Sequence, residues 1–264
     1  MSRITSISDL ERVAAERTAR DSSRSLRFTV CMGASCIASG AEAVLDALQT
    51  ALHGADATAD VTGTGCMGPC FRGPLIRVEP TGDVFTGVDP ADVSRIVDTA
   101  AANAVAAETQ AAGPASSTVP AAAAGELTAA AGELTDFFAP QRRVVLRNCG
   151  TIDPQEIRDA IAHGAYRALA GVLRDRSPEE IVGVLKESGL RGRGGAGFPT
   201  WLKWDLTRKA EGETKFVLCN ADEGDPGAFM DRSVLEGDPH SLIEGMAIAA
   251  RCVGASQGVV YVRA

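Results

Sequence analysis

The sequence predicts an α/β protein built from two folded units that are joined by a linker. Short apolar runs typical of strands alternate with segments whose apolar residues recur at helical spacing. Four of the seven cysteines fall within residues 1–70, ahead of the linker. Between residues 99 and 133 the composition shifts to alanine, proline and other small residues, which is typical of a tether. A length of 264 residues suits one or two domains.

Composition and charge exclude several classes of protein. The net charge is −8, with 26 basic and 34 acidic residues, and this argues against a nucleic-acid surface, which needs clustered lysine and arginine. No apolar run reaches the ~18 residues of a membrane span, and residues 1–20 lack the apolar core of a secretory signal. Seven cysteines, an odd number, argue against a disulfide framework. We therefore expect a cytoplasmic protein without membrane insertion.

The first predicted unit spans residues 26–98 and follows an N-terminal extension, residues 1–25, that carries a short amphipathic helix. An alternating run predicts a strand that ends at Cys31. Helical spacing near residues 44–52 predicts a helix, and a strand-like segment leads into Cys66. Two strand-like runs around a Pro-Thr-Gly turn then predict a hairpin, and a closing helix follows.

The four cysteines of this unit occur as two pairs. Cys31 and Cys36 are separated by four residues, and Cys66 and Cys70 by three. Two thiol pairs on loops can enclose one metal centre, and soft thiolates favour zinc or an iron–sulfur cluster. The spacing by itself leaves both open. Glycines beside the thiols favour iron, because their backbone amides are free to hydrogen-bond to sulfide.

The second predicted unit spans residues 134–264. We expect helices over residues 156–173, with Asp153 as a cap, and over residues 178–186, where Ser177, Pro178 and Glu180 form a helix start with a capping box. A further helix over residues 241–253 and a strand over residues 258–263 complete the unit. The remaining cysteines, at 149, 219 and 252, lack metal-ligand spacing and are expected to be small apolar residues of the interior.

A glycine-rich segment, residues 189–200, follows the second of these helices. Glycine lets a backbone lie directly against a ligand, and exposed amides beside arginine suit phosphate oxygens. Gly192, Gly194 and Gly197 match G-x-G-x-x-G, but that motif requires a preceding strand, and here a helix precedes it. The residues alone therefore leave a connecting loop and a phosphate cradle as alternatives.

A polar turn follows the strand predicted over residues 215–219. It carries one amide and three acids, namely Asn220, Asp222, Glu223 and Asp225. Ligand sites in open α/β sheets lie at the carboxyl ends of strands, so this turn is a candidate site. An acidic surface turn is the alternative.

Taken together, residues 190–204, 220–231 and 236–240 resemble the NADH-oxidising flavoprotein subunit of respiratory complex I. The same family includes the diaphorase subunits of NAD-linked hydrogenases and formate dehydrogenases. Residues 26–98, above all residues 65–74, resemble the thioredoxin-like [2Fe–2S] ferredoxins. The resemblance implies a thioredoxin-like [2Fe–2S] domain linked to the N-terminal half of a Rossmann-like FMN/NADH-binding domain. The family's C-terminal part, which completes the flavin fold and adds a β-grasp-like domain and a helical domain with a [4Fe–4S] cluster, is expected to be absent.

The resemblance also implies roles for individual residues. The cluster would be held by Cys31, Cys36, Cys66 and Cys70. FMN would be bound by the glycine loop and its neighbours, namely Gly192, Arg193, Gly194, Gly195, Gly197, Lys203, Asn220 and Asp222. Phe198 would stack on the adenine of NADH, and Glu223 and Asp225 would lie beside the bound nucleotide, with Glu223 as the catalytic candidate.

The implied function is electron input. NADH would be oxidised through FMN, and electrons would pass to iron–sulfur subunits of a hydrogenase, formate dehydrogenase or complex I-like assembly. One alternative is a [2Fe–2S] carrier or docking module whose flavin half is too incomplete to turn over. A weaker alternative is a zinc-stabilised assembly protein. The sequence leaves open the terminal acceptor and the choice between NADH and NADPH.

Overall fold

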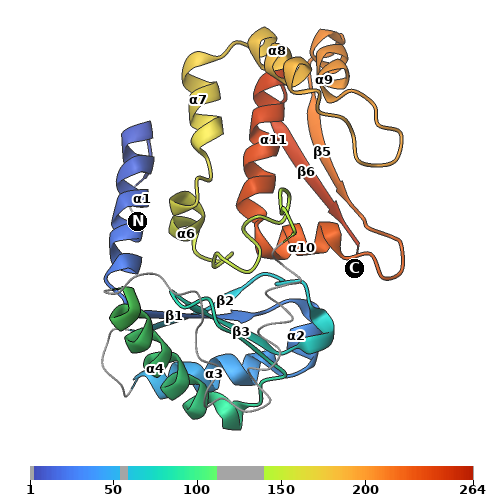
Figure 1. The fold of residues 1–264 in the computed structure, drawn as a ribbon. Coiled ribbons are helices and arrows are strands. Elements are labelled where there is room, and N and C mark those ends of the chain that lie inside the picture. Colours follow the sequence, from blue (N-terminus) through green and yellow to red (C-terminus); the bar gives the residue numbers. More distant parts are fainter. Residues whose placement is uncertain (1–2, 54–58, 112–139, 264) are drawn as a thin grey trace.

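The computed structural model describes residues 3–53, 59–111 and 140–263. These residues form two units that lie one above the other in Figure 1. The first unit contains a four-stranded sheet, and the second contains a two-stranded sheet within a set of helices. The mixed α/β class that the sequence predicted is confirmed.

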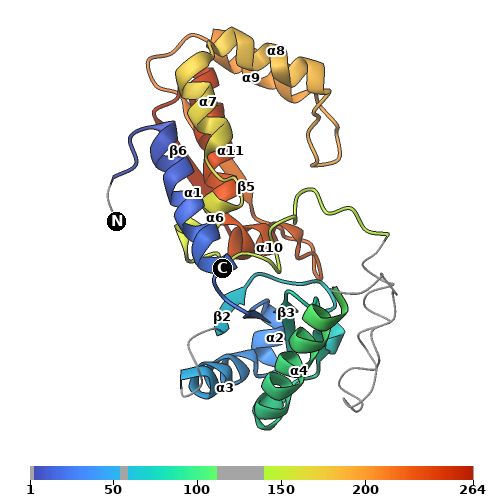
Figure 2. The same cartoon turned by 60° about the vertical axis from the view of Figure 1, so that its left-hand side comes forward.

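The sheet of the first unit has the strand order β2-β1-β3-β4. Strand β1 (Leu26–Cys31) pairs parallel with β2 (Ala59–Thr64) and antiparallel with β3 (Leu75–Glu79), which forms a hairpin with β4 (Val84–Thr86). The parallel pair requires a crossover, and α3 (Ala41–His53) supplies it. Helices α3 and α4 (Val93–Ala111) lie together on one face of the sheet (Figures 1 and 2).

The core of the first unit lies between this sheet and its two helices. Phe28 and Val30 alternate with polar residues along β1 and are fully buried, as are Leu48 of α3 and Ile76 of β3. Because strand side chains alternate between faces, Arg27 and Thr29 lie on the opposite face of β1. That opposite face is turned toward the second unit, where Arg27 contacts Asp159.

Helix α4 differs from the prediction at its end. We expected the linker to begin at residue 99, whereas α4 continues to Ala111. The continuation is alanine-rich, and alanine has the highest helix propensity of all residues. The remainder of the predicted linker, residues 112–133, lies outside the described residues.

Helix α1 (Ile7–Ser22) matches the helix expected in the N-terminal extension and starts with a capping box between Ser6 and Asp9. Its apolar residues pack on the second unit, not on the first: Leu10 and Val13 share a buried cluster with Ile161. Figures 1 and 2 both show α1 beside the helices of the second unit. The extension therefore connects the two units.

The second unit has a parallel pair of strands, β5 (Phe216–Ala221) and β6 (Gln257–Val262). Helix α11 (Pro239–Val253) supplies the crossover and contacts both strands. Ile181, Cys252 and Val253 form the centre of its core. The other helices are α6 (Ile157–Ala162), α7 (Arg167–Asp175), α8 (Pro178–Ser188), α9 (Thr200–Lys209) and α10 (Met230–Gly237).

The single helix predicted over residues 156–173 is wrong, because the chain forms α6 and α7 there. Glu156, not Asp153, provides the N-cap of α6. Between the two helices Tyr166 adopts a left-handed conformation with φ 67°. The amide of Tyr166 donates to the carboxylate of Glu244 at 2.8 Å, and that of Leu169 donates to it at 2.9 Å. A contact with Glu244, 75 residues away from Leu169 in sequence, thus fixes the point where α7 begins as a separate helix. The residues around this point contain no pattern that predicts it.

Helix α8 confirms the prediction for its start. The Ser177 hydroxyl accepts from the amide of Glu180, and the Glu180 side chain accepts from the amide of Ser177. Gly189 ends the helix in a left-handed conformation. Among the helices that the structure describes, none combines the length and apolar character that crossing a bilayer requires.

Candidate cofactor sites

The four predicted cluster cysteines lie together at one end of the first sheet. Strand β1 ends at Cys31, and α2 (Ala34–Ala38) carries Cys36 back beside it. Strand β2 leads to Cys66, and a 3₁₀ turn (Cys70–Arg72) begins at Cys70. Because β1 and β2 are parallel neighbours, both thiol-bearing loops leave the sheet at the same end. The topology therefore brings together two motifs that are about 30 residues apart in sequence.

The sulfur atoms form a chain of neighbours. The Sγ atoms of Cys66 and Cys70 are 3.7 Å apart, and the Cys31 thiol interacts with the thiols of Cys36 and Cys66 closely enough to shift its pKa. The Met67 amide also donates to Cys31 Sγ at 3.4 Å. The structure thus places all four predicted ligands in one group, although their role as ligands remains a prediction.

Two glycines permit this close approach. A Cβ on Gly33 would lie 3.0 Å from the Cβ of Cys66, and a Cβ on Gly73 would lie 2.7 Å from Cys36 Sγ. Real Cβ atoms essentially never make contacts below 3.0 Å, so Gly73 in particular has no room for a side chain. The glycines that were expected to hydrogen-bond with sulfide therefore have a packing role as well.

The donor set fits a binuclear cluster. Four cysteine thiolates are the usual ligands of a [2Fe–2S] cluster, in which each iron takes two protein ligands. Here the four thiols lie on two loops that contain glycines. The neighbouring pairs Cys31–Cys36 and Cys66–Cys70 match the requirement of two irons.

The thiols differ in protonation and exposure. The hydrogen bond between Cys31 and Cys36 raises the pKa of Cys31 and lowers the pKa of Cys36. A hydrogen bond with Cys31 raises the pKa of Cys66, and burial raises that of Cys70. Because iron binds thiolate, formation of a cluster here must release protons. Cys31 and Cys36 are buried, whereas Cys70 is exposed beside Phe71, so a cluster would have one covered and one open end.

The predicted phosphate loop joins α8 to α9 and closes on itself at its base. The Gly192 amide donates to the Phe198 carbonyl at 2.9 Å, and the Thr200 amide donates to the Leu190 carbonyl at 3.1 Å. Gly195 and Gly197 have φ of 97° and 61°, so these two positions require glycine. Space is open around the Cβ positions of Gly194, Gly195 and Gly197. A phosphate group could therefore approach this backbone directly, which fits FMN.

The side chains assigned to this loop are accessible. Arg193 is exposed, Phe198 is 44% exposed, and Lys203 lies exposed on α9. Arg191 donates to the carbonyl of Gly197 at 3.0 Å and so closes the loop from within. The Arg191 side chain therefore stabilises the conformation of the loop.

The predicted acidic turn follows β5 and leads into α10. The Glu223 carboxylate accepts from the amides of Asp231 at 2.8 Å and Arg232 at 2.9 Å. Desolvation works against the charge on Glu223, but these backbone hydrogen bonds outweigh it and lower its pKa. Glu223 also has φ 43°, a left-handed conformation that is uncommon for glutamate. The proposed catalytic residue thus has a structural role at the start of α10.

A cavity of about 370 Å³ lies against this turn. Asp222 and Glu223 line it, together with Arg232 and Arg263. The glycine loop contributes none of its lining residues, although the two loops project toward the same side of the unit in Figures 1 and 2. A shared flavin site between the loops therefore stays a prediction.

The two arginines of this cavity were not foreseen from the sequence. Arg263 donates to the Gly224 carbonyl at 3.2 Å, and a Cβ on Gly224 would lie 3.0 Å from the Arg263 guanidinium. Arg263 follows the strand beside the turn, and no motif in the sequence connects it with residues 39 positions earlier. The parallel pairing of β5 and β6 is what brings them together.

The first unit contacts the second through its cluster loop, a contact that the sequence also did not reveal. Thr64 Oγ1 donates to the Ile152 carbonyl at 2.7 Å, and Arg143 donates to the carbonyls of Met67 and Cys149. A Cβ on Gly65 would lie 2.4 Å from the Cα of Gly237. The backbone next to Cys66 is therefore in direct contact with the unit that carries the predicted flavin loop.

The three remaining cysteines follow the expectation in part. Cys149 and Cys252 are buried, as predicted, whereas Cys219 is only partly buried. Cys149 lies at the contact between the units, and burial raises the pKa of its thiol to about 11. Cys149 Sγ donates to the Ser233 carbonyl at 3.4 Å, which fits a packing residue.

Comparison with known proteins matches both units to families. Residues 19–101 match the thioredoxin-like [2Fe–2S] ferredoxin family, and residues 185–264 match the Nuo51 FMN-binding domain family.

Individual relatives agree with these matches. The NADP-reducing hydrogenase subunit HndC of Solidesulfovibrio fructosivorans is 56% identical over 124 residues, which cover 47% of this chain and 25% of the relative. An NADH-quinone oxidoreductase subunit of Rhizobium meliloti (strain 1021) is 52% identical over 120 residues, covering 46% of this chain and 28% of the relative. Among solved structures, the thioredoxin-like [2Fe–2S] ferredoxin from Aquifex aeolicus covers 28% of this chain and 82% of its own, at 28% identity and a TM-score of 0.27.

The matched region spans about a quarter of the length of these curated relatives. The family matches and the observed topology confirm the resemblance that the motifs indicated. The chain carries a thioredoxin-like [2Fe–2S] ferredoxin domain followed by residues of a Nuo51 FMN-binding domain.

Proposed function

We propose that this chain is part of an electron-input subunit that oxidises NADH through FMN and passes electrons to iron–sulfur clusters. The acceptors would be the iron–sulfur subunits of a hydrogenase, formate dehydrogenase or complex I-like assembly in the cytoplasm. Curated relatives support the class, because they are named as subunits of hydrogenases and of NADH-quinone oxidoreductases. NADH is the favoured substrate, although HndC is named as NADP-reducing.

One observation carries the proposal. The four thiols form one group, and the backbone beside them contacts the unit that bears the glycine loop and the acidic turn. A cluster bound by these thiols, which would exchange single electrons, would thereby be held against a unit suited to bind a nucleotide. FMN, when bound, supplies the exchange between a two-electron hydride donor and one-electron acceptors.

In this proposal the chain's own residues bind and orient the groups. Amides of the glycine loop and the Arg193 guanidinium would hold the FMN phosphate, and Lys203 would add positive charge. Asn220 and Asp222 would hydrogen-bond the flavin tail. Glu223, ionised because backbone amides lower its pKa, and Asp225 would lie beside the nicotinamide nucleotide.

A second function is favoured by a separate observation. The thiol group lies in a closed unit with a buried core, whereas the outer face of the second sheet is exposed, with Leu218 69% and Tyr261 58% accessible. This contrast suits a [2Fe–2S] carrier or docking module that lacks NADH oxidation of its own. The two functions share the cluster and differ in whether FMN binds.

The test measures iron, sulfide and FMN bound to the purified full chain, followed by NADH-dependent reduction of ferricyanide. Iron, sulfide and bound FMN with activity would support electron input. Iron and sulfide without FMN binding would select the carrier, and zinc in place of iron would contradict both.

A matched pair of variants sharpens the flavin part of this test. Arg193→Gln should weaken FMN binding by about 10- to 100-fold, the range for losing a charge-assisted hydrogen bond. Arg174→Gln, the same change at an exposed position of α7 next to Asp175, should leave FMN binding unchanged. Equal affinities in the two variants would remove Arg193 from the proposed site.

A further inference from the structure

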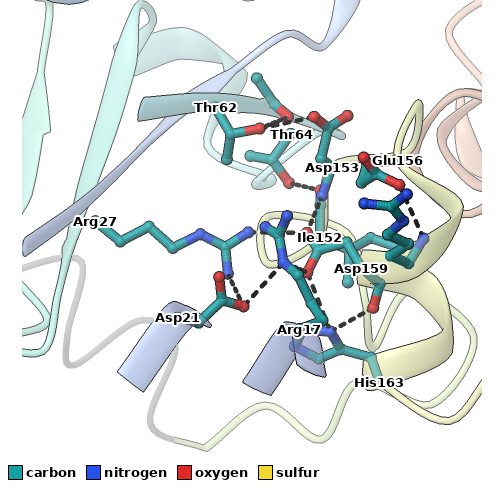
Figure 3. A network of polar contacts seen from close by, with 12 residues as sticks. Arg17, Asp21, Arg27, Thr62, Thr64, Ile152, Asp153, Glu156, Asp159 and His163 are labelled. Carbon is teal, nitrogen blue, oxygen red and sulfur yellow. Dashed lines mark hydrogen bonds and ion pairs between the residues drawn. The ribbon is translucent and has the colours of Figure 1, made fainter. Parts of the chain in front are cut away.

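A buried charge cluster lies where α1, the first sheet and the second unit meet (Figure 3). At its centre is Asp159 of α6, whose side chain is 0% exposed. Asp159 Oδ2 accepts from Arg27 of β1 at 2.8 Å, and Asp159 Oδ1 lies 3.6 Å from the Nε of Arg17 on α1. One carboxylate therefore contacts cations from two other elements, one of them in the first unit.

The same carboxylate also organises the chain that contacts β2. Asp159 Oδ2 accepts from the amide of Asp153 at 2.8 Å. On either side of that amide, the Ile152 carbonyl accepts from Thr64 and the Asp153 carboxylate accepts from Thr62, the latter at 2.9 Å. Figure 3 shows these contacts side by side, so Asp159 supports both the ion pair with β1 and the hydrogen bonds with β2.

The cluster is balanced in charge but incompletely hydrogen-bonded. Arg17 and Arg27 face Asp21 and Asp159, with His163 Nδ1 3.7 Å from Asp159 Oδ1. Burial works against the charge on Arg17, but the carboxylates of Asp159 and Asp21 outweigh it and raise its pKa. Within the described part of the chain, Asp21 Oδ1, Arg27 Nε and Asp159 Oδ1 have no hydrogen-bond partner.

Such a cluster is a poor source of stability, but in some proteins buried charges fix one arrangement of the packed elements. Replacing a buried ion pair by apolar residues is often neutral or stabilising, whereas removing one partner leaves a buried charge uncompensated. The charges of this cluster are compensated only when α1, β1 and α6 meet in one arrangement. Apolar contacts alone would tolerate sliding between the two units.

We propose that Asp159 is a positioning residue that fixes the orientation of the iron–sulfur unit on the second unit. The consequence reaches the thiols, because the cluster loop belongs to the same interface through Gly65 and Met67. Loss of the Asp159 contacts would uncover this loop and change its distance from the second unit. The inference is independent of the proposed function, because it concerns orientation and needs neither FMN nor NADH.

The experiment is amide hydrogen exchange, measured on the full chain by mass spectrometry for Asp159→Asn. Peptides covering residues 62–68 and 148–154 report the interface, and peptides covering residues 74–79 and 246–253 report the two cores. We expect exchange at the interface to rise by about 100- to 1,000-fold, as follows from leaving one partner of a buried ion pair uncompensated, with the cores unchanged. Unchanged exchange at the interface would overturn the proposal.

Variants of Arg27, the partner of Asp159, distinguish a loss of orientation from a loss of folding. Arg27→Met removes the cation of β1 and leaves Arg17 with Asp159, and it should also expose the interface selectively. Arg27→Lys, which keeps a cation, should restore part of the protection. A rise in exchange over both cores in Arg27→Met would overturn the proposal, since the cluster would then support folding and not orientation. Asp175→Asn, the same substitution at an exposed carboxylate of α7, should match the unmodified chain.

Discussion

The two units present opposite kinds of site. In the first unit the candidate thiols lie at the end of a four-stranded sheet whose core residues, such as Phe28 and Ile76, are fully buried. In the second unit the candidate loops extend from a two-stranded sheet whose outer face is exposed, including Leu218 and Val259. The thiol site can be described from contacts within its own unit, although the role of the thiols as ligands also stays a prediction. A site built on open loops depends on what binds there, and for this reason its residues stay predictions.

The sharpest contrast between the units is in their cofactor sites. Cys66→Ala should abolish the cluster, because it removes one of four ligand atoms and the loss should exceed the roughly 10- to 100-fold typical of residues that only support a ligand. Iron and sulfide content and the visible absorbance spectrum check this. Cys219→Ala, at a partly buried cysteine of the second unit, should retain the cluster. A full cluster in Cys66→Ala would disprove the assignment.

The two sheets also differ in how well their side chains are buried, and this difference predicts the next largest effect. Phe28→Ala in β1 should reduce the free energy of unfolding by about 3–5 kcal/mol, since it leaves a cavity at a side chain that is 0% exposed. Leu218→Ala in β5, at a side chain that is 69% exposed, should change it by less than about 0.5 kcal/mol. Urea unfolding followed by circular dichroism measures both. Comparable losses in the two variants would mean that the exposed sheet face is covered in solution.

The contact between the units gives an intermediate effect. Gly65→Ala places a Cβ 2.4 Å from the backbone of Gly237, and neither backbone can move aside without shifting its unit. We expect a loss of about 1–3 kcal/mol, the range for overpacking. Thermal unfolding measures the loss, and hydrogen exchange at residues 62–68 shows whether it falls at the interface. An unaffected melting temperature would indicate that the two units are not in contact there.

The smallest expected effect is a gain. Gly183 lies within α8, and a Cβ there meets nothing within 4 Å. Gly183→Ala should therefore raise the free energy of unfolding by up to about 1 kcal/mol through helix propensity alone. Gly183→Ala and Gly65→Ala both replace glycine by alanine, so Gly183→Ala is the matched control for Gly65→Ala. A loss of stability in Gly183→Ala would place this face of α8 in a contact.

The first unit could be predicted almost completely from the sequence. Its strands alternate in hydrophobicity, its helix α3 has clear apolar spacing, and its thiols occur at recognisable intervals. The second unit was predicted less well where distant residues decide the backbone. The division between α6 and α7 depends on Glu244, and the structural use of Glu223 depends on the start of α10. Neither dependence leaves a signal in neighbouring residues.

The sequence by itself determined the identity of each unit, because hydrophobic periodicity, helix caps and motif spacing act over a few residues. The capping box at Ser177, the hairpin of β3 and β4 and the two cysteine pairs are of this kind. Only the tertiary structure decided how the units meet, since the pairing of Arg27 with Asp159 joins residues 132 positions apart. Charged and small residues that are this far apart in sequence come into contact only after both units have folded. The residues around each of them therefore do not predict the contact.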